Sequence, residues 1–108
     1  MTVFVRLITF CSLLLCVCVF AIAQDAPEGL SANQVFRKDC AKCHGKNGEG
    51  RRFGGPSLVS EKTAGASADD LRNAIVNGKG RMPSFAGRLT PEQVDTLVRQ
   101  IQAANKPQ

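Results

Sequence analysis

The sequence predicts an all-α domain in which three main helices and irregular loops wrap around a bound non-protein group. No segment of the 108 residues shows the alternation of apolar and polar side chains that is typical of strands, whereas three segments carry apolar residues at helical spacing. Two long stretches rich in glycine, serine, proline and charge separate the helices. Loops of that length in a compact domain usually enclose something or serve a function. The length allows one domain.

The first 23 residues have the layout of a secretory signal peptide. Arg6 precedes the apolar run "LITFCSLLLCVCVFAI", and "AIA" then places small residues at the two positions that a signal peptidase reads. The alternative is an uncleaved membrane anchor, but the run is shorter than the ~20 residues that a spanning helix needs. We therefore expect a signal peptide over 1–23, a loose tail over 24–30 and the folded domain over 31–108, with the protein in the periplasm. Membrane attachment would follow only if the signal were retained.

Removal of the signal leaves a chain with few reactive side chains and a thin core. Of the five cysteines only Cys40 and Cys43 remain, with His44 as the one histidine and Met82 as the one methionine. The charge becomes 13 Lys and Arg (14 minus Arg6) against 9 Asp and Glu, a net of +4. The remaining aromatic residues are Phe36, Phe53 and Phe85. A small domain with so thin a core usually relies on a disulfide, a metal or another bound group.

The first helix is expected over residues 31–43. Ser31 is the expected N-cap, and Gly45 is a residue type at which helices end. The apolar stripe of this helix recurs at offsets of three, four, eight and eleven: Ala32, Val35, Phe36, Cys40 and Cys43. Residues 45–66 then form a loop by composition.

The second helix is expected over residues 67–77. Ser67 can cap it, Asp69 and Asp70 favour its positive end, and Gly78 fits the position just beyond its C-terminus. Its inward-facing residues are Leu71, Ala74 and Ile75. The stretch that follows, "KGRMPSFAGRL", is irregular, and its proline biases the preceding methionine toward extended backbone.

The third helix begins after Thr90 and closes the chain. Thr90 and Gln93 have the spacing of a capping box, and Pro91 occupies the first helical position, where proline is favoured. The buried stripe of this helix consists of Val94, Leu97, Val98 and Ile101.

The pentapeptide "CAKCH" at 40–44 carries the chemistry of the chain. A closed zinc site needs four ligands, and after signal removal only three cysteine and histidine side chains remain. A redox dithiol of the thioredoxin type belongs in a βαβ context, and a disulfide across this short loop would stabilise little. Two thiols separated by two residues and followed directly by histidine are the attachment motif of haem c, and this use employs all three side chains.

The iron of such a haem needs a sixth ligand or an open site. Met82 and water are the candidates, because the chain holds no second histidine. A lone methionine is ordinarily core packing. Met82, however, is the only methionine left, precedes a proline and lies in a polar loop, and a thioether is a soft ligand suited to haem iron.

From about Ser31 to Ala104 the chain resembles a small bacterial class I cytochrome c with one haem. The resemblance rests on "CAKCHG" (40–45), "GPSL" (55–58), "MPSFAGRLT" (82–90) and "QVDTLVRQI" (93–101). It implies the cytochrome c fold around one covalent haem c. The roles it implies are thioether links at Cys40 and Cys43, iron ligation by His44 and Met82, and a hydrogen bond from His44 to the carbonyl of Pro56. A turn-shaping role alone is the alternative for this proline.

The chain departs from the family pattern where the first and last helices are expected to cross. Ala32 stands where a glycine is usual, four residues before Phe36, and Gln100 stands where an aromatic residue is usual. The packing of this helix pair is therefore open.

Basic residues gather in the segments expected to surround the haem: Lys42, Lys46, Arg51, Arg52, Lys79, Arg81 and Arg88. Family resemblance implies that such a rim meets redox partner proteins with acidic docking surfaces, and complementary charge mainly steers their encounter. Arg52 and Arg81 are candidates for contacts to the haem propionates. Nucleic acid is excluded as a partner, since an exported chain with sparse aromatics lacks the marks of that class.

The function expected from these observations is one-electron transfer by a monomeric periplasmic carrier that transforms no substrate. A second possibility is a cytochrome subunit of a larger periplasmic dehydrogenase or reductase. The third is a haem enzyme or gas sensor with an open iron, which the lack of a second titratable side chain for acid–base work disfavours.

Overall fold

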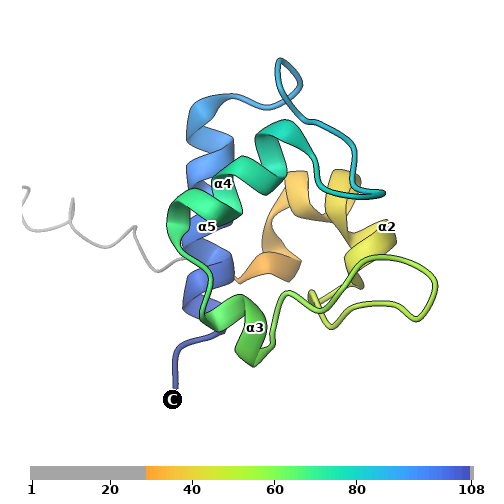
Figure 1. The fold of residues 1–108 in the computed structure, drawn as a ribbon, viewed down its shortest axis with the longest axis vertical. Coiled ribbons are helices and arrows are strands. Elements are labelled where there is room, and N and C mark those ends of the chain that lie inside the picture. The colour runs from red at the N-terminus through yellow and green to blue at the C-terminus, as the bar shows by residue number, and fades with distance from the viewer. Residues whose placement is uncertain (1–28, 108) are drawn as a thin grey trace, which may run out of the picture.

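The computed structural model describes residues 29–107, and in this part the chain is helical (Figure 1). In chain order the elements are the 3₁₀ turn η1 (Leu30–Ala32), the π-helical segment η2 (Phe36–Cys40), α2 (Ala41–His44), α3 (Glu61–Ala64), α4 (Ala68–Asn77) and α5 (Pro91–Ala104). Within residues 29–107 the only β-type pairing is the isolated bridge between Lys79 and Met82. The predicted all-α class is confirmed. The described residues contain no helix with the length and hydropathy needed to cross a membrane.

The N-terminal helix, which runs through η2 and α2, begins later than predicted. Ser31 lies inside the 3₁₀ turn, and the capping role belongs to Asn33, whose Oδ1 accepts hydrogen bonds from the N–H groups of Val35 (2.8 Å) and Phe36 (3.2 Å). The assignment of Ser31 as the cap was therefore wrong, because the chain first turns through η1. The predicted C-terminal end is correct: Gly45 follows the last helical residue with φ +86°.

The predicted tail also ends one residue too late. Leu30 is buried in the core, although it was assigned to the loose segment 24–30. An apolar side chain of this size packs wherever the adjoining turn carries it to the core, and η1 does so here. The expected signal peptide over 1–23 and the tail up to residue 28 lie outside the described residues.

The second and third helices form as predicted. In α4, Ser67 Oγ accepts from the Asp70 N–H and the Asp70 carboxylate accepts from the Ser67 N–H, which completes a capping box. Thr90 and Gln93 make the same pair of bonds at the start of α5. The predicted loop 45–66 contains one element not foreseen, the single-turn helix α3, which Ser60 caps.

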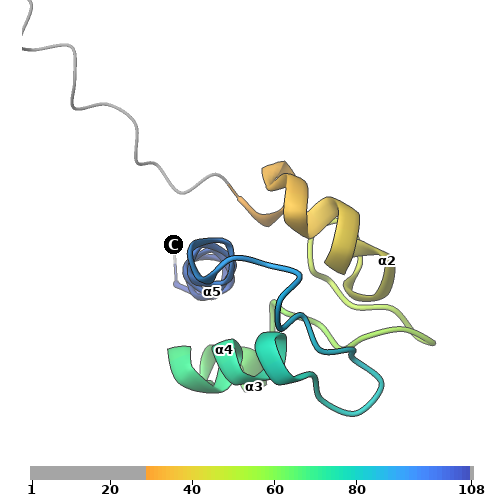
Figure 2. The same cartoon turned by 90° about the horizontal axis from the view of Figure 1, so that it is seen from above.

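The core lies where α5 packs against α4 and the N-terminal segment. Figure 2 shows α5 end-on, with these two elements on different sides of it. The largest fully buried side chains are Phe36, Leu97 and Val98. At the crossing with the N-terminal segment, Asn33 Nδ2 donates to the buried Gln100 Oε1 at 2.7 Å. Ala32, predicted to lie on the buried stripe, is exposed, because the break at Asn33 takes it off the helix.

Candidate functional site

A largely apolar cavity of about 600 Å³ opens between the N-terminal helix, the loop after it, α4, the loop before α5, and α5. This volume is within the roughly 300–1,000 Å³ of typical ligand and cofactor pockets. The apolar side chains that line it come from every one of these elements: Phe36, Leu58, Leu71, Ile75, Phe85 and Leu97. The cavity therefore lies inside the domain's own core and is bordered by residues distant in sequence.

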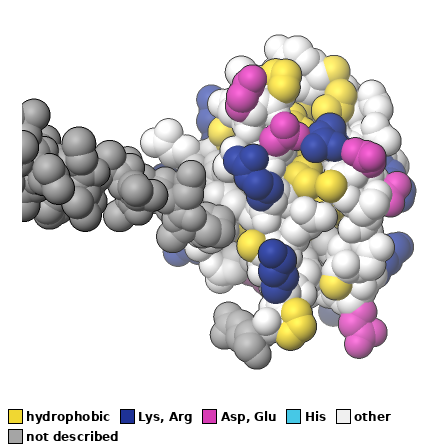
Figure 3. Space-filling model, turned by 90° about the vertical axis from the view of Figure 1, so that its left-hand side faces the viewer, with side chains coloured by type: hydrophobic (Ala, Val, Ile, Leu, Met, Phe, Trp, Pro, Cys, Tyr) yellow, Lys and Arg dark blue, Asp and Glu magenta, His cyan; other side chains and the backbone are white. Residues whose placement is uncertain are grey.

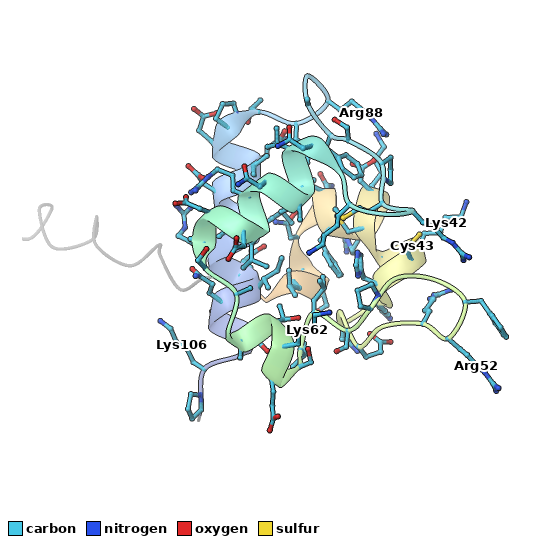
Figure 4. The ribbon with its side chains drawn as sticks, viewed as in Figure 1. Lys42, Cys43, Arg52, Lys62, Arg88 and Lys106 are labelled. Carbon is cyan, nitrogen blue, oxygen red and sulfur yellow. The ribbon has the colours of Figure 1, made fainter. Side chains whose placement is uncertain are left out.

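Both cysteines of the "CAKCH" motif border this cavity as free thiols. Cys40 is half-buried, and Cys43, labelled in Figure 4, is exposed. Burial, together with the negative charges of Asp39 and Cys43, raises the pKa of the Cys40 thiol to about 11. As a free side chain, the Cys40 thiol is therefore protonated at neutral pH.

His44 ends α2 and is buried against the cavity, with only 8% of its surface exposed. Its Nδ1–H donates to the carbonyl oxygen of Pro56 at 2.8 Å. A carbonyl can only accept, so in the neutral imidazole this bond places the proton on Nδ1 and the lone pair on Nε2. The imidazole is thus held in the state in which its second nitrogen can bind a metal.

The loop after the N-terminal helix is tied closely enough to bring Pro56 to His44. Gly55 N–H donates to the Cys43 carbonyl at 2.7 Å, and Gly50 N–H donates to the His44 carbonyl at 2.6 Å. A side chain at residue 55 would place its Cβ only 2.7 Å from His44 Cε1, so glycine is required there. This close approach of backbone to imidazole explains the glycine of the "GPSL" piece.

Met82 borders the same cavity from the loop between α4 and α5. Backbone bonds in both directions with Lys79 (3.1 and 3.0 Å) close the turn that presents it. Gly78, at φ +77°, lets this turn return to α4, since a Cβ there would lie 2.6 Å from the Met82 carbonyl oxygen. The loop is also fastened to α4 by the Phe85 N–H, which donates to the Ile75 carbonyl at 3.1 Å.

The basic residues singled out in the sequence do not all reach the cavity. Lys79 and Arg81 line its edge. Arg52 is not among the lining residues: it extends away from the body of the domain (Figure 4), with its guanidinium 5.6 Å from the ring of the exposed Phe53. Arg88 lies over the ring of Phe85 at 4.8 Å.

Sequence reasoning missed one polar residue near the site. Asn105, just beyond α5, forms side-chain hydrogen bonds to the segment that follows Pro56. The only local signal is its place after a helix, where asparagine is a common ending. Its contacts are 45 and 47 residues away in sequence, and no local pattern reports them.

The donor set fits a covalently bound haem. Two free thiols, one imidazole nitrogen and one thioether sulfur border a single apolar cavity, and these are the groups that thioether attachment and iron ligation use. Within residues 29–107 no group of three or more His, Cys, Asp and Glu side chains could hold a metal ion by itself.

Comparison with known proteins gives the same result. The family model described as "Cytochrome C oxidase, cbb3-type, subunit III" matches residues 27–101. Cytochrome c6 from Nostoc sp. is 29% identical over 106 residues, which cover 85% of this chain and 88% of that protein. Cytochrome c6 from Gloeothece citriformis is 34% identical over 91 residues, 75% of this chain and 73% of that protein.

A larger protein also shares the domain. The cbb3-type cytochrome c oxidase subunit FixP of Azorhizobium caulinodans is 30% identical over 76 residues, 68% of this chain but only 26% of that protein. The similarity to this subunit is thus confined to one part of its length.

Proposed function

The chain belongs to the cytochrome c family, and from this premise we propose that it is a one-electron carrier of the periplasm. The haem c of this family supplies, when bound, an iron that alternates between Fe(II) and Fe(III). The observation that carries the proposal is the convergence of Cys40, Cys43, His44 and Met82 on one apolar cavity. The similarity to cytochromes c6, which extends over most of the length of both chains, also supports electron transfer as the function.

Each of the four side chains has a distinct role in this proposal. Cys40 and Cys43 anchor the haem through thioether bonds, and His44 binds the iron through Nε2. The Pro56 carbonyl orients the His44 imidazole and raises its basicity through the bond at 2.8 Å. Met82 supplies the soft sixth ligand, which raises the reduction potential relative to harder ligands.

The surrounding residues keep this arrangement constant between the two iron states. The turn that carries Met82 is closed by its two bonds with Lys79, and the loop that carries Pro56 is tied to the backbone of Cys43 and His44. Apolar lining excludes water from the cavity. Ligands that do not move between oxidation states keep the reorganisation small, and in this proposal the protein transforms no substrate.

Export and docking complete the proposal. The signal layout of residues 1–23 supports a periplasmic location. Lys79 and Arg81 at the cavity edge, with the exposed Lys42 next to Cys43, support docking of a redox partner with an acidic surface. Arg81 is the better placed of the two predicted propionate partners, because Arg52 extends away from the cavity.

The proposal is tested on the exported, purified protein. A pyridine haemochrome spectrum with intact mass should report one covalent haem and cleavage after Ala23. The ferric protein should show the weak near-infrared band of a sulfur–iron bond. Met82→Leu keeps an apolar side chain of similar size but should abolish the band and lower the potential, while Leu58→Ala, in the same cavity, should keep the band. A wild-type protein that lacks this band, or that binds carbon monoxide tightly at neutral pH, would instead indicate an open iron.

The second candidate function is that of a cytochrome subunit in a larger complex. It is favoured by the similarity to part of an oxidase subunit and by the name of the matching family model. Stoichiometric co-purification with a dehydrogenase, reductase or oxidase would support it. A monodisperse monomer that exchanges electrons rapidly in bimolecular reactions would contradict it.

A further inference from the structure

The side chain of Asn105 connects the C-terminal end of α5 to the loop that holds Pro56. Its Nδ2 donates to the carbonyl of Leu58 at 2.7 Å and to the carbonyl of Ile101 at 2.8 Å. Its Oδ1 accepts from the N–H of Ser60 at 3.0 Å. One half-buried amide therefore makes three hydrogen bonds, of which only that to Ile101 belongs to the end of the helix.

The segment that Asn105 contacts is held together by its own internal hydrogen bonds. Thr63 Oγ1 donates to the carbonyl of Ser57 at 3.0 Å, and the Thr63 N–H donates to Ser60 Oγ at 3.3 Å. The segment 57–64 includes α3, which Figure 1 shows at the same end of the molecule as the end of α5. The hydrogen bonds of Asn105 to Leu58 and Ser60 connect this segment to the end of α5.

The position of the segment bears directly on His44. Pro56 precedes Ser57, and its carbonyl receives the Nδ1–H of His44. From the other side, the Leu58 N–H donates to the carbonyl of Gly48 at 2.7 Å. Only Ser57 separates Pro56 from Leu58, and Leu58 is held from both sides: its N–H donates to the Gly48 carbonyl and its own carbonyl accepts from Asn105 Nδ2.

We propose that Asn105 is a positioning residue for the redox site, acting through Leu58 and Ser60 on the Pro56 carbonyl that orients His44. The inference rests on the proposed function, in which His44 binds the haem iron. A hydrogen bond from Nδ1–H to a well-placed carbonyl raises the basicity of the ligating imidazole, which favours Fe(III) over Fe(II). Loosening that carbonyl lowers the basicity and raises the reduction potential.

The bonds that remain without Asn105 set the size of the effect. The links from Leu58 to Gly48 and from Gly55 to Cys43 persist, so haem attachment and the axial ligands are retained. Direct loss of such an outer partner typically costs 10–100-fold in affinity or activity. An indirect loosening should shift the potential upward. It should also speed solvent exchange of the His44 Nδ1–H by about tenfold, because the local opening that exchange requires is then opposed by fewer hydrogen bonds.

The test uses the haem-loaded protein and its Asn105→Ala and Asn105→Leu variants. Asn105→Leu keeps the volume and removes all three hydrogen bonds, so it separates bonding from packing. Val94→Ala is the matched control: Val94 is buried in the first turn of α5, at the opposite end from Asn105, and its truncation destabilises the same helix. The readouts are the reduction potential and, by NMR of the ferrous protein, exchange of the Nδ1–H normalised to the core amide of Leu97.

Both Asn105 variants should raise the potential and the normalised exchange rate, while Val94→Ala should leave both at the wild-type value. Wild-type values in Asn105→Leu would overturn the inference, and so would an equal shift in Val94→Ala. A wild-type protein with no covalent haem would overturn the proposed function itself. The haemochrome spectrum and intact mass of the wild-type protein show this before any variant is compared.

Discussion

Asn33 makes the polar contacts that start the N-terminal helix and join it to α5. Its Oδ1 caps the helix by accepting from the N–H groups of Val35 and Phe36. Its Nδ2 donates to Gln100, which is only 6% exposed. A side-chain hydrogen bond contributes about 1 kcal/mol to stability, so this pair of polar residues stabilises the crossing of the two segments. The sequence did not predict how the first and last helices pack against each other, and the structure shows that a hydrogen bond between Asn33 and Gln100 joins them.

Replacing Asn33 by alanine should lower the free energy of unfolding by about 2 kcal/mol, of which roughly 1 kcal/mol is the cap and roughly 1 kcal/mol the bond to Gln100. Asn33→Ser keeps a capping oxygen but cannot reach Gln100, so it should lose about half as much. Urea denaturation of the haem-loaded protein measures both values. Asn73→Ala, on the exposed side of α4, serves as the control and should stay within about 0.5 kcal/mol of wild type. Equal losses for alanine and serine would show that the bond to Gln100 contributes nothing.

The residues of the site differ in how far the sequence could predict them. Spacing alone singles out Cys40, Cys43 and His44, because the chemistry requires those types at those intervals. Met82 was singled out because it is the only methionine left after removal of the signal, precedes a proline and lies in a polar loop. Asn33 and Asn105 could not be found this way. Their side chains bond to residues 67, 45 and 47 positions away, and only the folded chain brings those partners together.

At the scale of the elements, helices with a complete local signal form where the sequence places them. Both α4 and α5 begin with a capping box, in which side chain and backbone satisfy one another within four residues. The N-terminal helix lacks such a box, and its start was misplaced at Ser31. Its π-helical segment Phe36–Cys40 was not predicted either, since a periodicity of 3.6 residues does not mark a wider turn.

The start of α4 should depend on pH through Asp70. The Ser67 hydroxyl donates to the Asp70 carboxylate at 2.7 Å and holds the pKa of that carboxyl below its usual range. A lowered pKa in the folded state means that this stabilisation is complete above about pH 4, the ordinary carboxyl value, and is lost as the pH falls through the lowered pKa. Asp70→Asn resembles the protonated side chain, so it should be less stable than wild type at neutral pH and equally stable in acid.

Denaturation of both proteins between pH 7 and pH 2, followed by far-ultraviolet circular dichroism, measures this difference. Glu92→Gln is the control, because Glu92 also lies in the first turn of a helix but takes no part in the capping box of α5. Its difference from wild type should vary less with pH. A difference for Asp70→Asn that stays constant down to pH 2 would show that the carboxylate is not what stabilises α4.

At the scale of the whole molecule, several basic side chains lie around the opening of the cavity. Lys42 and Arg52 project from the elements around Cys43 (Figure 4), and Lys79 and Arg81 line the cavity edge. The face in Figure 3, on the side of α4 and α5, instead mixes basic and acidic side chains. On α4, Arg72 forms ion pairs with Asp69 (2.6 Å) and Asp95 (2.8 Å). An anion that approaches the cavity opening therefore meets Lys42, Lys79 and Arg81, for which no ion pair is formed within residues 29–107.

This distribution predicts that the rate of electron transfer to an anionic partner depends more on the position of a charged side chain than on the net charge of the protein. Lys42→Glu and Lys106→Glu change the net charge equally, but Lys42 adjoins Cys43 whereas Lys106 lies beyond α5 at a distant end (Figure 4). At low ionic strength, oxidation of the ferrous protein by anionic ferricyanide should slow roughly threefold or more in Lys42→Glu. The reason is that positive charge near the site of electron transfer attracts the anion and raises the rate of productive encounters. It should change little in Lys106→Glu. In 1 M salt, where the Debye length is about 3 Å, the two rates should converge. Stopped-flow kinetics at several salt concentrations measures this, and equal slowing in both variants would mean that ferricyanide responds only to the total charge.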